Sequence, residues 1–262
     1  MQTDMTVGKP MKMLLNFTIP VFLGNVFQQL YSMADAVIVG KFVGTKGLAA
    51  VGATGTITFL IIGFLMGLTT GFTVLTSQRF GAGRMDEMRK TVGNAAILSV
   101  VIAVVMTAVS MLGMHRLLVF MHTPEDIFDG AYGYIMIICA GIFTQVLYNL
   151  VSSILRALGN SKTPLYFLIL AAVLNIVLDL IFIIFFHWGA PGAAWATVIS
   201  QGVSGGLCLI YMWKAVPELK MKKEDWYFNR DIAVKQISVG IPMGLQYSIT
   251  AIGGMMVQSS LN

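Results

Sequence analysis

The stretch Ala171–Phe186, AAVLNIVLDLIFIIFF, decides the fold because it is almost entirely apolar yet contains Asn175 and Asp179. With its flanking residues it is long enough to cross a bilayer, which takes a helix of about 20 apolar residues. An aspartate inside a membrane helix costs at least about 2.5–3.5 kcal/mol, so it usually faces a protein interior or a water-filled cavity. Because residues four apart share one helix face, we expect Asn175 and Asp179 to point the same way.

The composition of the whole chain indicates the same class of protein. Of 262 residues, 56% are hydrophobic and only 11% are charged, and the mean hydropathy is +0.79. These are too few polar side chains to cover a soluble globule. The sequence therefore predicts an all-α polytopic membrane protein with the lipid bilayer as its surroundings. The net charge of +5 sits at the ends of the apolar segments, so no nucleic acid partner is expected.

The apolar segments predict six transmembrane helices followed by a seventh. The seventh begins near Ile237 and is still running, or just ending, at Asn262. The first six are expected at Met13–Val39, Val51–Phe80, Thr91–Leu112, Ala131–Leu155, Pro164–Phe186 and Gly192–Met212.

The basic residues predict how these helices are oriented. Fourteen of the seventeen lie in the N-terminal lead or in the loops after the second, fourth and sixth helices, and only Lys41, Lys46 and Arg116 lie on the other side. Cytoplasmic loops carry the excess of Lys and Arg. We therefore expect the N-terminus in the cytoplasm and a multi-pass protein of the plasma (inner) membrane.

The longest polar stretch divides the chain. We expect a six-helix lobe over residues 1–213, a cytoplasmic linker over 214–236, and over 237–262 the first helix of a truncated second lobe. Gly240-Ile241-Pro242 repeats the pattern of Thr18-Ile19-Pro20 early in the first helix. Transporters are often built from such repeats, so the chain is expected to need a second six-helix lobe that lies outside it.

Three polar groups fall at one depth in the outer half of the membrane. Asp35 lies five residues inside Gly40, and Thr197 five inside Gly192, or about 8 Å each at 1.5 Å per residue. Asp179 lies seven residues inside Phe186, or about 10 Å. Asp35 and Asp179 are the only two of the twelve acidic residues that lie within apolar segments. The agreement in depth predicts a single site, with Asn175 beside Asp179.

Polar side chains also recur at helical spacing on three segments. Any one stripe can be explained by hydrogen bonds between helices, each worth about 0.6–2 kcal/mol. Three stripes together with two carboxylates favour a polar central cavity. From these stripes we take as candidate substrate-cavity residues Asn25, Gln28, Ser32, Gln145, Asn149 and Gln201.

The motifs of common membrane and soluble enzymes do not occur. There is no Walker A loop, HExxH, GxSxG or TVGYG, so nucleotide hydrolysis, protease or serine hydrolase chemistry and potassium selectivity have no motif. The chain is not expected to be an enzyme, and no cofactor is expected.

Several stretches together make the chain resemble the multidrug and toxic compound extrusion (MATE) transporters of the NorM and DinF kind. The likeness covers nearly the whole chain. It rests on Gln28–Tyr31 through Asp35, Gly47–Gly52, Gly81–Arg84, Leu155–Asn160 with Lys162–Pro164, Asn175 to Asp179, and Gly192–Thr197.

The resemblance implies twelve helices in two lobes and cation-driven export of organic, often cationic, compounds by alternating access. It places the family's sodium or proton site at Asp35, Asn175, Asp179 and Thr197, which would be the Na⁺ ligands if coupling is to sodium. Unlike many members, the chain has no acid in its seventh helix. Two close carboxylates cannot both stay ionised cheaply, so loading Na⁺ or H⁺ would relieve repulsion.

Two other functions remain open at this point. A lipid-linked oligosaccharide flippase of the same wider superfamily would need a large, more cationic cavity, and only Arg156, at a cytoplasmic helix end, approaches a membrane segment. A non-transporting membrane subunit would explain a half-length chain, with the two carboxylates acting only as interhelical contacts.

Overall fold

The computed structural model describes residues 10–261. Residues 1–9, which include Lys9 of the basic N-terminal lead, and Asn262 lie outside it. The described part is almost entirely helical and no strand occurs in it. Its elements are α1 (Pro10–Phe42), α2 (Thr45–Gly81), α3 (Met85–Phe120), α4 (Glu125–Ala140), α5 (Ile142–Ala157), α6 (Lys162–Leu180), η1 (Ile181–Phe185), α7 (Gly189–Ala215), η2 (Pro217–Leu219), η3 (Lys223–Trp226) and α8 (Arg230–Leu261).

The all-α membrane fold predicted from the sequence is confirmed. Within residues 10–261, five helices are long and apolar enough to cross a membrane, and α4 with α5 makes a sixth span if the bent pair counts as one. Each predicted segment corresponds to one of these spans, and the seventh corresponds to α8. The helices are longer than the predicted segments, because the segments were limited to apolar residues and the helical backbone continues into the polar residues at their ends.

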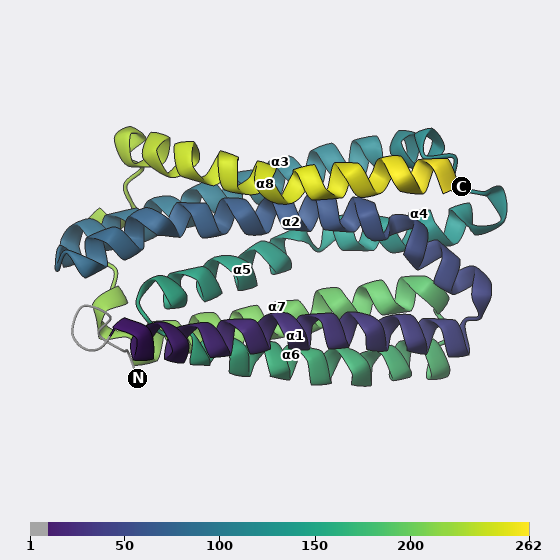
Figure 1. Ribbon diagram of the computed structural model, residues 1–262, viewed down its shortest axis with the longest axis horizontal. Coiled ribbons are helices and arrows are strands. Elements are labelled where there is room, and N and C mark those ends of the chain that lie inside the picture. Colours follow the sequence, from purple (N-terminus) through teal and green to yellow (C-terminus); the bar gives the residue numbers. More distant parts are fainter. Residues whose placement is uncertain (1–9, 262) are drawn as a thin grey trace.

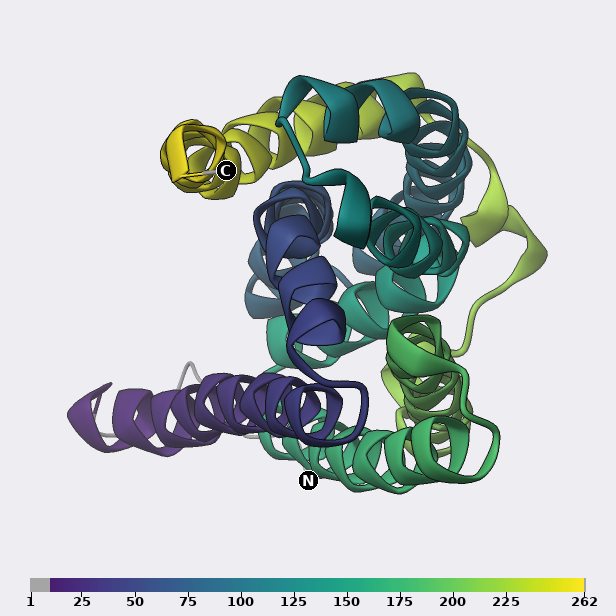
Figure 2. The ribbon, with the colours of Figure 1, turned by 90° about the vertical axis from the view of Figure 1, so that its right-hand side faces the viewer.

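The helices form two groups that run along one long axis (Figure 1). In one group α6 packs against α1 and α7, and in the other α2 packs against α3 and α8, with α4 and α5 between them. The view along the axis shows α1 and α8 reaching out to the same side of the bundle (Figure 2). The first helix of the predicted lobe and the helix after the linker are thus neighbours of the same central helix, α2.

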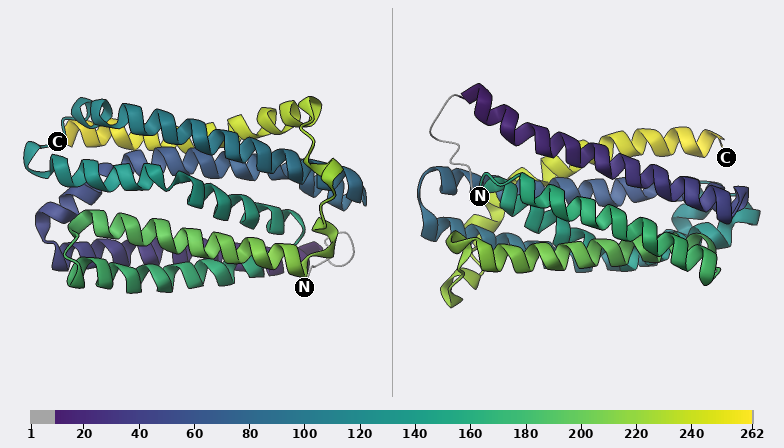
Figure 3. Two further views of the ribbon diagram at one scale, coloured as in Figure 1. Left: turned by 180° about the vertical axis from the view of Figure 1, so that it is seen from behind. Right: turned by 90° about the horizontal axis from the view of Figure 1, so that it is seen from below.

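The loops that carry the basic residues gather at one end of the bundle. The N-terminal end of α1, the α2–α3 and α5–α6 connections and the linker before α8 all lie there (Figure 3). If successive helices cross the membrane in opposite directions, these basic loops must lie at one end, and the structure places them there. That this end faces the cytoplasm stays a prediction.

The predicted segment Ala131–Leu155 is a bent span and not one straight helix, because the structure interrupts it at Gly141. The axes of α4 and α5 differ by 48°. A methyl group at Gly141 would overlap the side chain of Val198 on α7, so glycine permits the close approach of α7 at the bend. The Thr144 hydroxyl donates a 2.8 Å hydrogen bond to the Gly141 carbonyl just beyond the break.

A second interruption occurs in the stretch that decides the fold. The α-helix α6 ends at Leu180, one residue after Asp179, and continues as the π-helical turn η1. π-helical turns are rare and occur often at functional sites. The predicted segment Pro164–Phe186 is therefore one span with a change of helix type directly beyond its aspartate.

The stretch after α7 is shorter than the predicted linker. It holds the two 3-10 turns η2 and η3, and α8 begins at Arg230, seven residues before Ile237. The backbones of α2 and α8 lie very close together where the two helices cross. A Cβ on Gly67 would lie 2.5 Å from the Met243 carbonyl oxygen, and one on Gly71 would overlap the backbone of Gly240. The pairs Gly67–Gly244 and Gly71–Gly240 thus let the two backbones meet, as small residues do in membrane helices.

Candidate functional site

The two membrane acids come together from α1 and α6. Asp179 is completely buried and neither of its carboxylate oxygens has a hydrogen-bond partner within residues 10–261. Asp35 also has a buried oxygen, Oδ1, without a partner there. The two carboxyls lie within interaction range of each other. Buried acceptors without donors are costly, so this pair suits a bound cation or proton.

Asn175 and Thr197 join the same buried group from α6 and α7. Their side chains are 1% and 7% exposed, and the Asn175 amide nitrogen donates a 3.4 Å hydrogen bond to the Thr197 hydroxyl. The Asn175 carbonyl oxygen, Oδ1, has no partner. The structure therefore brings together all four residues that were predicted as a cation site. Their donor atoms are all oxygens, which hard cations such as Na⁺ prefer.

Two tyrosines complete the surroundings of the acids, and the sequence reading missed both. The phenol groups of Tyr31 on α1 and Tyr134 on α4 are each close enough to Asp35 and Asp179 to interact with their charges. Tyr31 stands four residues before Asp35, so its place on the same helix face could have been found from spacing. Tyr134 belongs to no polar stripe, and nothing in the sequence assigns it to the site.

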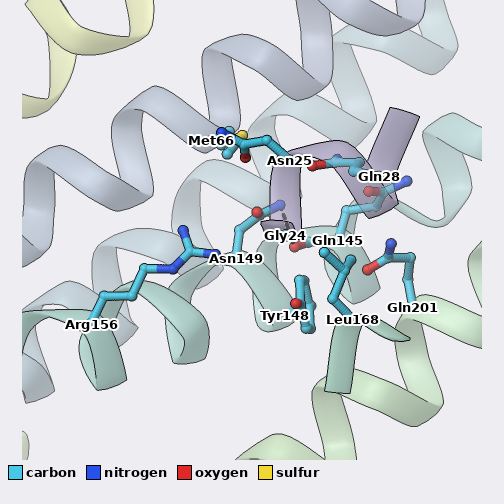
Figure 4. Close-up of a pocket in the computed structure, with 10 residues that line it drawn as sticks. All are labelled: Gly24, Asn25, Gln28, Met66, Gln145, Tyr148, Asn149, Arg156, Leu168 and Gln201. Atoms are coloured by element: carbon cyan, nitrogen blue, oxygen red, sulfur yellow. Dashed lines mark hydrogen bonds between the residues drawn. The ribbon is translucent and has the colours of Figure 1, made fainter. Parts of the chain in front are cut away.

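A polar cleft adjoins this group, and Figure 4 shows its walls. The cleft is narrow and open to solvent, and about 370 Å³ of space, solvent included, lies between its walls. Four long helices, α1, α5, α6 and α7, contribute to it together with one residue of α2. The ten lining residues are Gly24, Asn25, Gln28, Met66, Gln145, Tyr148, Asn149, Arg156, Leu168 and Gln201.

Five of the six predicted cavity residues line this cleft, and Ser32 does not. Ser32 is exposed, and its hydroxyl donates a 3.0 Å hydrogen bond to the Gln28 carbonyl one turn earlier in α1. Helical spacing placed Ser32 on the same stripe as Gln28. The hydroxyl instead satisfies its own helix, which short polar side chains often do.

Arg156 differs most from its expected position. It was taken as a residue of a helix end, and it is indeed in the last turn of α5, yet its side chain lines the cleft (Figure 4). Its Nε is buried and has no hydrogen-bond partner in the described chain. The cleft thus contains a positive charge that the position of Arg156 at a helix end did not predict.

Gln201 connects the cleft with the acids. It lines the cleft and lies four residues after Thr197 on α7, while its side chain interacts with that of Tyr31. Tyr31 in turn lies beside both acids. A change at the carboxyl pair can therefore reach the cleft wall through two side chains.

Known proteins share this architecture. A family model described as MatE matches residues 20–181. Among curated relatives, the probable multidrug resistance protein YpnP of Bacillus subtilis is 33% identical over 261 residues, which are 99% of this chain and 58% of YpnP. An FAD transporter of Shewanella oneidensis is 27% identical over 207 residues, or 76% of this chain and 46% of that protein.

Solved structures agree with the sequence relatives. The outward-facing conformation of a multidrug resistance MATE family transporter of the MOP superfamily superimposes with a TM-score of 0.85 at 28% identity, covering 94% of this chain and 55% of that one. The chain thus spans about half the length of the relatives and structures it matches. Since the family model matches more than half of its residues, the chain belongs to the MatE family, that of the multidrug and toxic compound extrusion proteins.

Proposed function

We propose that this chain forms one lobe of a membrane transporter that exports small organic compounds in exchange for Na⁺ or H⁺. The observation that carries the proposal is the buried pair Asp35 and Asp179, whose unpartnered oxygens lie beside a polar cleft. A structural contact between helices would be expected to satisfy these oxygens with donors. A site that loads and releases a cation needs them free of permanent partners.

Charge repulsion supplies a physical route from the cation to the fold. When Asp35 and Asp179 are both ionised they repel each other, and a proton or Na⁺ between them removes that repulsion. The two residues stand on α1 and α6, which pack together, so loading favours a closer approach of these helices. Since Tyr31 moves with α1 and interacts with Gln201, the cleft changes with the load.

The family supports transport rather than enzyme chemistry. YpnP is described as a multidrug resistance protein, and the matched structure as a multidrug resistance transporter. Alternating access requires a second lobe that moves against this one, and the chain spans about half of those proteins. We propose a location in the plasma membrane with the basic end of the bundle in the cytoplasm.

Efflux by the complete gene product tests the proposal. Cells that lack their own drug pumps are loaded with ethidium, and its loss is followed with the unaltered protein, Asp35→Asn and Asp179→Asn. Each variant keeps the size of the side chain but cannot balance a cation, so efflux is expected to fall to the background. Asp126→Asn is the matched control, because Asp126 is an exposed acid paired with Lys46 at 3.7 Å.

Imposed gradients separate the two coupling ions. In proteoliposomes, a Na⁺ gradient at constant pH and a pH gradient without Na⁺ are applied in turn, and dye movement is recorded. Dependence on either gradient that disappears in Asp179→Asn supports antiport. Unchanged efflux in both acid variants would contradict the mechanism, and absence of flux from the complete protein would favour a non-transporting subunit.

A further inference from the structure

We propose that the cleft binds the phosphate group of an organic anion, with Arg156 as the counter-charge. The inference rests on the proposed function and names the substrate class of the same cleft. Its basis is the polarity of the wall, where the only charged residue among the ten is an arginine and the others are amides, a tyrosine and apolar groups. An arginine without an acid favours an anionic ligand over a cationic one.

Within the described part of the chain, no acid pairs with Arg156. The groups that feel its charge are the Tyr148 phenol and the Cys208 thiol, which are neutral side chains. Charged side chains within membrane proteins usually pair with one another or mark substrate pathways. A guanidinium that lines a cleft without a carboxylate therefore marks the place of an anion.

The remaining donors of the wall also suit a phosphate. The side chains of Asn25, Gln28 and Gln145 make no hydrogen bond within the described chain, so their amide N–H groups are available. The Tyr148 hydroxyl already donates to the Pro164 carbonyl at 3.0 Å. A guanidinium with several amides offers more N–H groups than the two oxygens of a carboxylate accept. Arginine matches phosphate through its planar fork of donors.

The length of the cleft indicates how such a ligand would lie. Gln145, Asn149 and Arg156 stand on one face of α5, and Arg156 is seven residues beyond Asn149, or about 10 Å along the axis. The anionic group would sit at the Arg156 end, and an uncharged, hydrogen-bonding part would extend along the amides toward Gln201. The Arg156 end of the cleft is the end farther from the bend at Gly141.

A purely structural role for Arg156 makes a different prediction. A cation in the last turn of a helix stabilises the carbonyls at that end, worth about 0.3–1 kcal/mol. In that case Arg156→Gln lowers the melting temperature but does not change which ligand is preferred. The distinguishing measurement is therefore the preference between two ligands that differ only in a phosphate.

Riboflavin and riboflavin 5′-phosphate are such a pair. The purified full chain is placed in nanodiscs of neutral phosphatidylcholine, and binding of each flavin is followed by fluorescence anisotropy. We expect the phosphate form to bind at least roughly tenfold more tightly, because hydrogen bonds to charged groups are the stronger ones. Arg156→Gln is expected to remove the preference, and Arg156→Lys to restore part of it. Arg116→Gln, a neutralisation of an exposed arginine on α3, is the control.

The outcomes separate this inference from the proposed function. Equal binding of the two flavins, or a preference that survives in folded Arg156→Gln, overturns the inference. If ethidium efflux still depends on Asp35 and Asp179 in that case, the proposed function stands. Nanodiscs containing phosphatidylglycerol form a second arm: displacement of riboflavin phosphate there, through Arg156, supports the phosphate site with a lipid headgroup as occupant.

Discussion

The amide nitrogen of Asn175 donates a 3.4 Å hydrogen bond to the hydroxyl of Thr197, and this leaves the Asn175 carbonyl oxygen without a partner. The bond fixes which way the amide is turned. Its nitrogen is held by α7, so the oxygen is the atom left for the proposed cation beside Asp179. A neutral hydroxyl on one helix thus orients an acceptor on another.

Thr197→Val is predicted to weaken cation binding without removing any charge. The valine has nearly the same shape but no hydroxyl, so the Asn175 nitrogen loses its acceptor, and hydrogen bonds of this kind between membrane helices are worth about 0.6–1.7 kcal/mol. We expect the Na⁺ or H⁺ concentration for half-maximal efflux to rise several-fold. Thr197→Ser should restore it, since serine keeps the oxygen.

Ser200→Ala provides the control for Thr197. Its hydroxyl is also buried on α7 but donates to the Thr197 carbonyl of its own helix at 3.0 Å. If Ser200→Ala changes the cation dependence as much as Thr197→Val, the orienting role of Thr197 is wrong.

The glycine crossing of α2 and α8 predicts a stability effect. In Gly67→Ala the added carbon would lie 2.5 Å from the Met243 carbonyl oxygen, which is backbone and cannot turn aside. Overpacking of this kind costs about 1–3 kcal/mol. Thermal unfolding of the purified chain in detergent should show a lower midpoint for Gly67→Ala.

Gly55→Ala is the control for this crossing, because it is in the same helix and a Cβ there meets nothing within 4 Å. Alanine favours helix over glycine by about 0.5–1 kcal/mol, so its midpoint should stay or rise. Equal midpoints for the two variants would mean that α8 does not press on Gly67 in solution.

Asn94 is predicted to hold the segment before α8 against α3. Its side chain accepts a 3.0 Å hydrogen bond from the Asn229 backbone nitrogen and donates one of 3.4 Å to the Tyr227 carbonyl. Asn94→Ala removes both, at a cost of about 1–3 kcal/mol for buried groups left without partners. Trypsin should then cut faster at the neighbouring lysines Lys220, Lys222 and Lys223.

Ser99→Ala tests whether any small change on α3 would do the same. Its hydroxyl is buried and has no partner among the described residues, so its removal breaks no bond to the linker. Cleavage at the unaltered rate is expected. A cleavage rate in Asn94→Ala equal to that of Ser99→Ala would contradict the role of Asn94.

The sequence was sufficient for the parts of this protein that depend on the bilayer. Hydrocarbon requires long apolar helices, and it makes Asp35 and Asp179 conspicuous, so the spans and the proximity of the two acids could be predicted. Depth sets one coordinate of a residue, and helical spacing sets its face. Together these predicted one place for Asp35, Asp179 and Thr197, with Asn175 beside Asp179.

What the sequence could not predict depends on contacts between helices. The break at Gly141 follows from the approach of Val198, which is 57 residues away in the chain, and a lone glycine in an apolar run does not reveal it. Tyr134 belongs to the site only because α4 packs against α2 and α7, which are both neighbours of α1. Arg156 looked like a helix-end residue because the sequence shows where α5 ends but not which cleft its side chain enters.

The bend between α4 and α5 provides a prediction that two substitutions can test together. Gly141→Ala places a methyl group into the side chain of Val198, so it should force α5 away from α7 and lower both thermal stability and efflux. Val198→Ala removes the two methyl groups that are struck, and the double variant should regain much of the lost midpoint. Val203→Ala, an exposed valine of the same helix, is the control and should give no rescue. If the double variant is no more stable than Gly141→Ala alone, the contact with Val198 is not what makes glycine necessary at the bend.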